Sequence, residues 1–123
     1  MPLFEPGQVV LILFPFTDTG GAKKRPALVL LDAGDDDILV ARITAQPRQT
    51  VFDCELRDWP QAALKTASTV RLHKLATLNK QLVDRTLGHL SPADWQLVCR
   101  SFQQVSGAMR PSPSRVGRAD GAE

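Results

Sequence analysis

Two short apolar runs near the N-terminus limit what this chain can fold into. "VVLILF" (residues 9–14) and "PALVLL" (residues 26–31) are short and rich in apolar residues, which is typical of strands. The polar segment between them contains Gly20 and Gly21. This order predicts an antiparallel hairpin with a long connection, whose first strand lies at the centre of the core, buried on both faces. Pro26 is expected at the start of the second strand, where a missing N–H is tolerated.

Alternation of apolar and polar residues predicts three further strands. They are "ILVARIT", "VFDCEL" and the longer "STVRLHKLATL". In the first, Arg42 and Thr44 share one face. In the second, Asp53 is expected to point outward, and in the third Arg71 and His73 are expected to project together.

The C-terminal part of the chain predicts an amphipathic helix. Ser91 is a candidate N-cap, followed by Pro92 at the first helical position, and Gly107 is expected to end the helix. One face of this helix would carry Trp95, Val98, Cys99, Phe102 and Val105. The preceding "NKQLVDRTLG" predicts a short helix from Asn79 to Gly88, with a strand as the alternative.

Length and composition predict one folded domain. The 123 residues, 43% of them hydrophobic, suffice for a single core over residues 1–106. Residues 107–123 are rich in Pro, Gly and Ser, so we expect a disordered tail. About five short strands and one C-terminal helix indicate a mainly β fold, a small bent sheet or β-barrel.

Charge and cysteine usage narrow the function classes. The formal net charge is only +2, so polyanion binding would need local clustering of Lys and Arg. Cys54 and Cys99 lack zinc-ligand spacing, and we expect both thiols to be reduced and buried. No signal peptide or apolar stretch of membrane-spanning length is visible. We therefore expect a cytoplasmic protein without a metal, a cofactor or a membrane partner.

Several motifs together resemble a known family. "PGQVVLILFPFTDTGGAKKRPALVL", "ILVARITAQ", "DCELRDW" and "STVRLHKLATLNKQLVDRTLGHLSPADW" resemble, in order and spacing, the PemK/MazF family of type II toxin–antitoxin ribonucleases. The resemblance extends from Pro6 to about Val105. "FPFTD", "KKRPALVL" and the Ile-Thr that ends the third strand are its most specific elements.

The resemblance implies both a fold and an activity. The fold is an SH3-like barrel with a C-terminal helix, assembled as a homodimer. The activity is metal-independent cleavage of single-stranded RNA, especially mRNA, by attack of a ribose 2′-OH, which leaves a 2′,3′-cyclic phosphate and a 5′-OH. Such toxins arrest translation and growth until a cognate antitoxin binds them.

The resemblance also assigns catalytic candidates. Arg25 would be the main catalytic residue, because its planar guanidinium can bind two phosphate oxygens. On the residues alone, an arginine paired with Asp18 or Asp53 is the alternative. Thr44 could donate its hydroxyl to the phosphate, and an ordinary strand threonine is the alternative. The family often has Ser after this Thr, where this chain has Ala45.

Arg71 and His73 form a second catalytic pair of candidates. Many relatives carry Asp at the position of His73, so the chain departs from the family there. A histidine could exchange protons near neutral pH, and Arg71 could contact phosphate. A solvent-facing histidine and a solvated strand arginine are the alternatives.

Loop and strand-end residues are candidates for RNA binding. Lys23 and Lys24 would attract phosphate without sequence preference, unless they are merely solvated. Aromatic side chains could stack on bases. The RNA-binding candidates besides the two lysines are Phe16, Thr17, Gln46 and Trp59.

Two other functions remain possible on the same barrel. One is a non-catalytic toxin that inhibits a protein target such as DNA gyrase. The other is an inactive relative that only binds antitoxin or RNA. Retention of Arg25 and Thr44 favours the ribonuclease, whereas Ala45 and His73 keep the inactive relative open.

Overall fold

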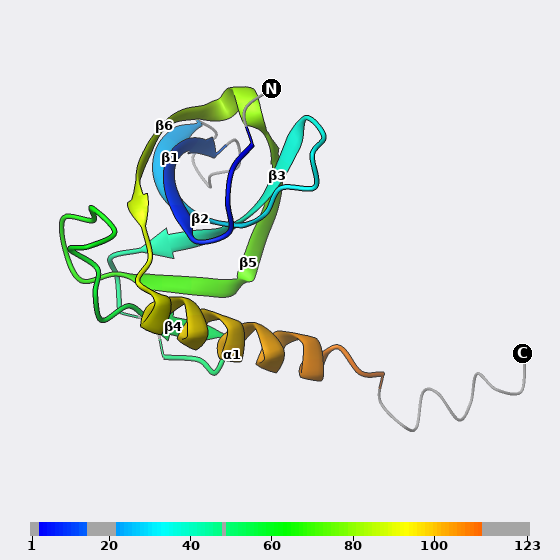
Figure 1. The fold of residues 1–123 in the computed structure, drawn as a ribbon. Helices are drawn as coiled ribbons and strands as arrows, with labels where there is room; N and C mark the ends of the chain where they lie inside the picture. Colours follow the sequence, from blue (N-terminus) through cyan, green and yellow to red (C-terminus); the bar gives the residue numbers. More distant parts are fainter. Residues whose placement is uncertain (1–2, 15–21, 48, 112–123) are drawn as a thin grey trace, which may run out of the picture.

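The computed structural model describes residues 3–14, 22–47 and 49–111, and it confirms a mainly β fold with one C-terminal helix. The strands are β1 (Gln8–Phe14), β2 (Lys23–Leu31), β3 (Asp37–Thr44), β4 (Asp53–Glu55), β5 (Thr69–Asn79) and β6 (Val83–His89). They form one antiparallel sheet in the order β4-β5-β3-β2-β1-β6. Figure 1 shows the sheet curled into a barrel, with the helix α1 (Pro92–Ala108) lying across one side.

The predicted hairpin of β1 and β2 is confirmed, but the predicted place of β1 is wrong. β1 pairs with β2 on one side and β6 on the other, so it is the last strand but one. Leu11 and Leu13 on this strand are only half-buried. Leu11 borders an open pocket, so β1 is not covered on both faces along its whole length.

The position of Pro26 also differs from the prediction. β2 starts at Lys23, so Pro26 lies inside the strand, opposite Leu11 of β1. The ladder between β2 and β3 ends at the pair Ala27 and Arg42. Beyond that pair β2 continues along β1 and β3 continues along β5, so the two strands separate. Pro26 therefore lies where β2 has no partner on its β3 side, and its missing N–H costs little.

Residues 79–89 are mostly strand. Asn79 is a cap as predicted, and its side chain accepts a hydrogen bond of 2.8 Å from the Gln81 N–H. The helix it caps is a single 3₁₀ turn, η1 (Lys80–Leu82), and β6 follows directly. Gly88 therefore lies in a strand and ends no helix. A Cβ at Gly88 would come within 2.6 Å of the Ala62 backbone, so glycine permits close chain packing here.

The buried apolar residues form two clusters. One is formed by Val10, Ile12, Phe14, Ala27, Val29, Ile38, Val40 and Leu78. The larger one is formed by Val9, Leu28, Ala41, Ile43, Cys54, Leu56, Ala62, Leu64, Val70, Leu72, Leu90 and Val98. The second cluster packs β4, β5 and the segment before β5 against α1. It therefore holds the segment between β4 and β5 in place.

The helix α1 begins as predicted. Ser91 is its N-cap and accepts a hydrogen bond from the Asp94 N–H. Only Val98 of the predicted apolar face is fully buried, and both Cys99 and Phe102 are exposed. The prediction that both thiols are buried is thus wrong for Cys99, because α1 meets the sheet along a narrow stripe of side chains.

The end of α1 differs slightly from the prediction. Gly107 lies inside α1, which ends at Ala108, two residues beyond the predicted domain boundary. The predicted disordered tail falls mainly on residues 112–123, which lie outside the described residues. In the described part of the chain, α1 is too short and too polar to cross a membrane.

Candidate functional site

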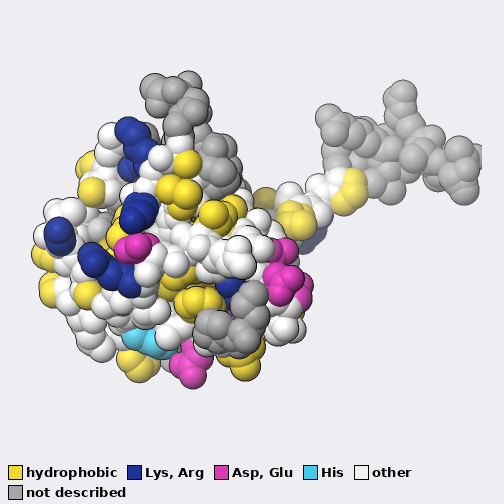
Figure 2. Space-filling model, turned by 90° about the horizontal axis from the view of Figure 1, so that it is seen from above, with side chains coloured by type: hydrophobic (Ala, Val, Ile, Leu, Met, Phe, Trp, Pro, Cys, Tyr) yellow, Lys and Arg dark blue, Asp and Glu magenta, His cyan; other side chains and the backbone are white. Residues whose placement is uncertain are grey.

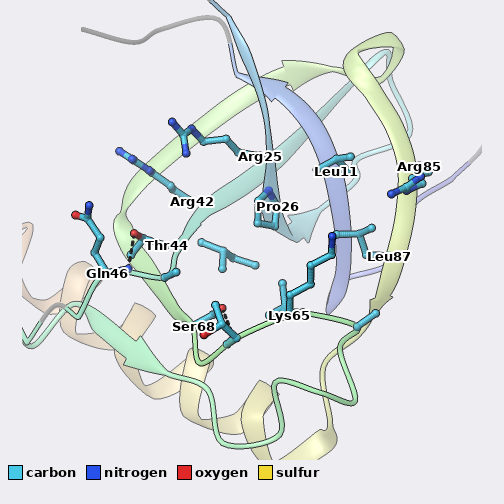
Figure 3. Close-up of a pocket in the computed structure, with 15 residues that line it drawn as sticks. Leu11, Arg25, Pro26, Arg42, Thr44, Gln46, Lys65, Ser68, Arg85 and Leu87 are labelled. Atoms are coloured by element: carbon cyan, nitrogen blue, oxygen red, sulfur yellow. Dashed lines mark hydrogen bonds between the residues drawn. The ribbon is translucent and has the colours of Figure 1, made fainter.

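A pocket of about 590 Å³ lies where β2 and β3 separate. Arg25 and Pro26 of β2 form one side, and Thr44 with the following residues forms the other. Its lining residues are Leu11, Arg25, Pro26, Arg42, Ile43, Thr44, Ala45, Gln46, Ala63, Leu64, Lys65, Thr66, Ser68, Arg85 and Leu87 (Figure 3). We call this space the notch pocket.

Arg25 and Arg42 stand side by side at one rim of the notch pocket. Arg42 pairs directly with Ala27, and Arg25 lies two residues before Ala27, so their side chains share a face. Figure 3 shows both guanidinium groups pointing the same way. We call this pair the arginine rim, and it can offer several N–H donors to one anion.

Thr44 lies two residues beyond Arg42 and therefore faces the same opening. Its Oγ1 accepts a hydrogen bond of 3.1 Å from the Gln46 N–H. Accepting this bond fixes the hydroxyl oxygen and leaves the hydroxyl hydrogen to donate. The structure thus brings the candidates Arg25, Thr44 and Gln46 together around one pocket.

The pocket is strongly cationic. Among the described residues, four cations line it and no Asp or Glu does. Among the described residues, none of these four forms an ion pair; the described ion pairs are Lys24–Asp84, Arg71–Asp53 and Lys80–Asp32. Sequence reasoning missed Arg42, Lys65 and Arg85. Arg42 had a signal, since it shares a strand face with Thr44, whereas Lys65 and Arg85 reach the pocket only through tertiary folding.

Arg71 and His73 project together as predicted, but they lie outside the notch pocket. Arg71 Nε is 2.8 Å from Asp53 Oδ1, and Arg71 Nη2 is 3.3 Å from His73 Nε2. The prediction that Asp53 points outward is wrong, because its side chain is only 1% exposed. The ion pair compensates this burial. Arg71 is the cross-strand partner of Arg42, so the cluster adjoins the arginine rim.

The pKa values of this cluster are shifted. Burial alone would raise the pKa of Asp53, but hydrogen bonds from Arg71 and Thr50 outweigh it and lower that pKa. The pKa of His73 is lowered by burial and by the charge of Arg71. Because arginine can only donate, Nε2 of His73 accepts from Arg71, and this assigns the ring proton to Nδ1.

The remaining candidates are scattered. Lys23 and Lys24 are exposed at the start of β2, and Lys24 Nζ lies 3.2 Å from Asp84 Oδ1. Figure 2 shows several Lys and Arg side chains gathered on one side of the molecule. Trp59 packs against the larger core cluster and does not line the notch pocket. Phe16 and Thr17 lie outside the described residues, as does Asp18, so the structure says nothing of them.

One wall of the pocket comes from the segment between β4 and β5. This segment is a series of turns that includes Ala63 with φ 62°. The fully buried Asp94 holds its start, with Oδ1 accepting from the Arg57 N–H at 3.1 Å and Oδ2 from the Asp58 N–H at 2.8 Å. Ser91 Oγ donates to Asp58 Oδ2 at 2.7 Å. The cap of α1 therefore also positions this wall.

The described residues contain no metal-binding cluster, and the buried Cys54 thiol is not reactive. Within the ranges that the structure describes, no three His, Cys, Asp or Glu side chains are grouped to hold a metal ion. Burial raises the pKa of the Cys54 thiol to about 11, which keeps it protonated at neutral pH.

Comparison with solved structures finds the same fold in bacterial toxins. An endoribonuclease from mycobacterial species is 19% identical with a TM-score of 0.71, covering 90% of this chain and 98% of its own. A mycobacterial endoribonuclease in complex with its cognate antitoxin is 22% identical with a TM-score of 0.68, covering 90% and 100%. MazF from Deinococcus radiodurans is 18% identical with a TM-score of 0.68, covering 87% and 99%.

Sequence comparison identifies the family. No curated protein sequence matches the chain. The family model of the PemK-like, MazF-like toxin of type II toxin–antitoxin systems matches residues 5–106. This match spans the whole barrel and nearly all of α1. The chain therefore belongs to the PemK-like, MazF-like family of type II toxin–antitoxin toxins.

Proposed function

We propose that this protein is an endoribonuclease toxin that cleaves single-stranded RNA, in particular mRNA, and so arrests translation and growth. The observation that carries the proposal is the placement of Arg25 and Thr44 at one cationic pocket, which no carboxylate of the described residues lines. Family membership and the fold of named endoribonucleases support it. A pocket of this charge suits a phosphodiester strand.

The proposed reaction is attack of a ribose 2′-OH on the neighbouring phosphorus. The bond from phosphorus to the 5′-oxygen breaks, leaving a 2′,3′-cyclic phosphate and a 5′-OH. The 2′-OH proton leaves to a base, and the departing 5′-oxygen takes up a proton. Arg25 is placed to stabilise the charge that develops on the phosphate oxygens, and the Thr44 hydroxyl can donate to the same group. No step requires a metal ion.

Arg71 and His73 have a secondary place in the proposal. They lie on β5 beside Arg42, where an RNA strand leaving the arginine rim would meet them. In the observed geometry the Nε2 lone pair of His73 is engaged by Arg71, so this nitrogen would accept a proton only after the contact breaks. We therefore propose direct phosphate chemistry for Arg25 and Thr44, and RNA contact for Arg71 and His73.

The partners follow from the same proposal. A cognate antitoxin would block the RNA site, as suits a family in which an endoribonuclease has been solved with its antitoxin. We also propose a homodimer in the cytoplasm. Lys23, Lys24, Phe16, Thr17 and Gln46 would add contacts to RNA beyond the reacting phosphate, whereas Trp59 lies against the core.

Incubation with a long single-stranded RNA in EDTA tests the proposal. We expect wild type to cleave and to leave 5′-OH ends. Arg25→Ala should lose roughly 100-fold or more in rate, the usual cost of removing one donor to a developing charge. Arg100→Ala removes an exposed cation of α1 that lies outside the notch pocket, and it should cleave normally. Absence of cleavage by wild type on every RNA would favour the non-catalytic or inactive alternatives.

A further inference from the structure

The notch pocket has a second cationic side that the proposed chemistry does not use. Lys65 comes from the wall between β4 and β5, and Arg85 comes from β6. Figure 3 shows Lys65 reaching into the pocket from the side opposite the arginine rim, with Arg85 beyond Leu11 and Leu87. Both residues are exposed. We call this pair the far rim.

The far rim is cationic, and no charge among the described residues neutralises it. Of the residues that the structure describes, no carboxylate lines the pocket and none forms an ion pair with Lys65 or Arg85. Lys24, by contrast, has Asp84 as its partner. An unpaired cation beside a pocket attracts anionic ligands more strongly than a cation that is already neutralised.

The floor between the two rims is apolar. Arg85 is the cross-strand partner of Leu11, and Leu11 is the partner of Pro26. Leu11 and Pro26 are both half-buried, and with Leu87 they separate the far rim from the arginine rim (Figure 3). Because β6 and β2 are separated only by β1, their axes lie about 10 Å apart. Two long cationic side chains can therefore reach neighbouring phosphates across this floor.

Lys65 stands on a braced segment. Its neighbour Leu64 is buried in the larger core cluster, and the Leu64 N–H donates to the Trp59 carbonyl at 3.2 Å. Asp94 fixes the start of the segment through two backbone N–H groups. The backbone under Lys65 is therefore held in place, which lowers the entropic cost of using its side chain for binding.

We propose that Lys65 and Arg85 form a second phosphate-binding site for the same RNA strand. The arginine rim would hold the phosphate that reacts, the far rim would hold a neighbouring phosphate, and the base between them would lie on Leu11, Pro26 and Leu87. This inference rests on the proposed function, because it takes single-stranded RNA as the ligand. It places the inserted base on an aliphatic floor.

The salt dependence of RNA binding tests the inference without relying on cleavage. The probe is a mixed-sequence single-stranded oligonucleotide with 2′-O-methyl groups, which cannot react through its 2′-oxygens. Fluorescence anisotropy gives its affinity from about 0.05 to 0.2 M KCl. Lys65→Ala and Arg85→Ala should each lower the steepness of log affinity against log salt by about 0.7. Each should weaken binding roughly tenfold at low salt.

A control variant shows whether weaker RNA binding comes from the far rim or from the loss of any positive charge. Arg100→Ala should leave both slope and affinity unchanged, because Arg100 lies on α1 outside the notch pocket. Far-ultraviolet circular dichroism and thermal unfolding confirm that each variant is folded. The exposed positions of Lys65 and Arg85 make them unsuited to a core role, so folded variants are expected.

The outcomes distinguish this inference from the proposed function. If wild type cleaves RNA but folded Lys65→Ala and Arg85→Ala keep the wild-type slope and affinity, the second site is refuted and the ribonuclease stands. If wild type cleaves nothing but both slopes fall, the binding site stands and the catalytic proposal fails. If wild type does not bind the oligonucleotide, the second site is refuted as well.

Discussion

The Arg71 guanidinium lies 2.8 Å from the carboxylate of Asp53, and both side chains are largely withdrawn from water. The contact joins β4 to β5 beside Arg42, which lines the notch pocket. A carboxylate held this way should make the stability of the protein sensitive to acid.

Asp53 gives a prediction about pH. Its pKa is lowered from the ordinary value of 3.8, because hydrogen bonds from Arg71 and Thr50 favour the charged form more than burial disfavours it. A lowered pKa stabilises the folded state above the ordinary value, and this stabilisation is lost as pH falls through the folded pKa. Urea unfolding between pH 7 and 3 should therefore show a loss of stability below about pH 4.

Asp53→Asn should make the free energy of unfolding depend less steeply on pH in the acidic range. Asp53 accepts from Arg71 at Oδ1 and from Thr50 at Oδ2, whereas an amide has one acceptor oxygen, so we expect the substitution to cost about 2 kcal/mol at pH 7. Glu55→Gln, on the same strand but exposed, is the control and should leave the curve unchanged. A curve for Asp53→Asn as steep as that of wild type would contradict the assignment.

Thr44 gives a prediction about the chemistry. Thr44→Val keeps the shape of the side chain but removes the hydroxyl, and it should lower kcat for RNA cleavage roughly 100-fold. Thr44→Ser keeps the hydroxyl and should retain at least about a tenth of the wild-type rate. Removing such a donor altogether usually lowers the rate about 100-fold or more. Single-turnover cleavage assays measure both. Equal activity of the valine and serine variants would show that the hydroxyl has no part in the reaction.

His73 gives a prediction that separates RNA contact from proton transfer. We expect His73→Gln to lower kcat/KM less than tenfold and to leave the pH profile of kcat unchanged. The reason is that Arg71 already occupies the Nε2 lone pair of this exposed histidine. The profile should be recorded from about pH 5 to 8, the range in which histidine titrates. Loss of an acidic limb in the variant would instead make His73 the general base.

Asp94 gives a prediction about the pocket wall. Asp94→Asn replaces one carboxylate oxygen by an N–H donor that faces a backbone N–H, at a cost of about 2 kcal/mol. Because residues 57–64 then lose their anchor, KM for RNA should rise more than kcat falls. Ser91→Ala should cost about 1 kcal/mol through the lost helix cap. A change in kcat alone, with KM unaffected, would argue against a positioning role.

Gly88 gives a prediction about close packing. A Cβ there would lie 2.6 Å from the Ala62 backbone, so Gly88→Ala should destabilise the protein by about 1–3 kcal/mol. Gly107 is the matched control, since a Cβ there meets nothing within 4 Å and the residue is helical. Gly107→Ala should stabilise by up to about 1 kcal/mol. Chemical denaturation of both variants tests the pair, and a neutral Gly88→Ala would show that residues 62 and 88 separate easily.

Local patterns in the sequence were sufficient for much of the fold. The run at residues 9–14, the alternation around Cys54 and the Ser91 cap each predicted the observed element, because strand pairing and capping depend on near neighbours. Gly88 misled the prediction. It looked like the end of a helix, although its real role is to let β6 approach a backbone segment 26 residues earlier in the chain, at Ala62.

The sequence likewise predicted only part of the candidate site. Arg25 and Thr44 were found through the family motifs, and the structure places both at the notch pocket. Asp53 was expected in solvent, because it alternates with apolar residues along its strand. In the structure Arg71 of the neighbouring strand pairs with the Asp53 carboxylate, which is buried. Trp59 was expected near RNA, yet its side chain packs against the core.

The sequence by itself determined the strands β1 to β5, the helix and its cap, and the family, since these depend on residue type and spacing along the chain. Only the tertiary structure decided where β2 and β3 separate, and which cations meet at that opening. Arg25, Arg42, Lys65 and Arg85 come from four different parts of the chain. Electrostatic complementarity depends on distance in space, so no pattern of neighbours could have shown that these four charges surround one pocket.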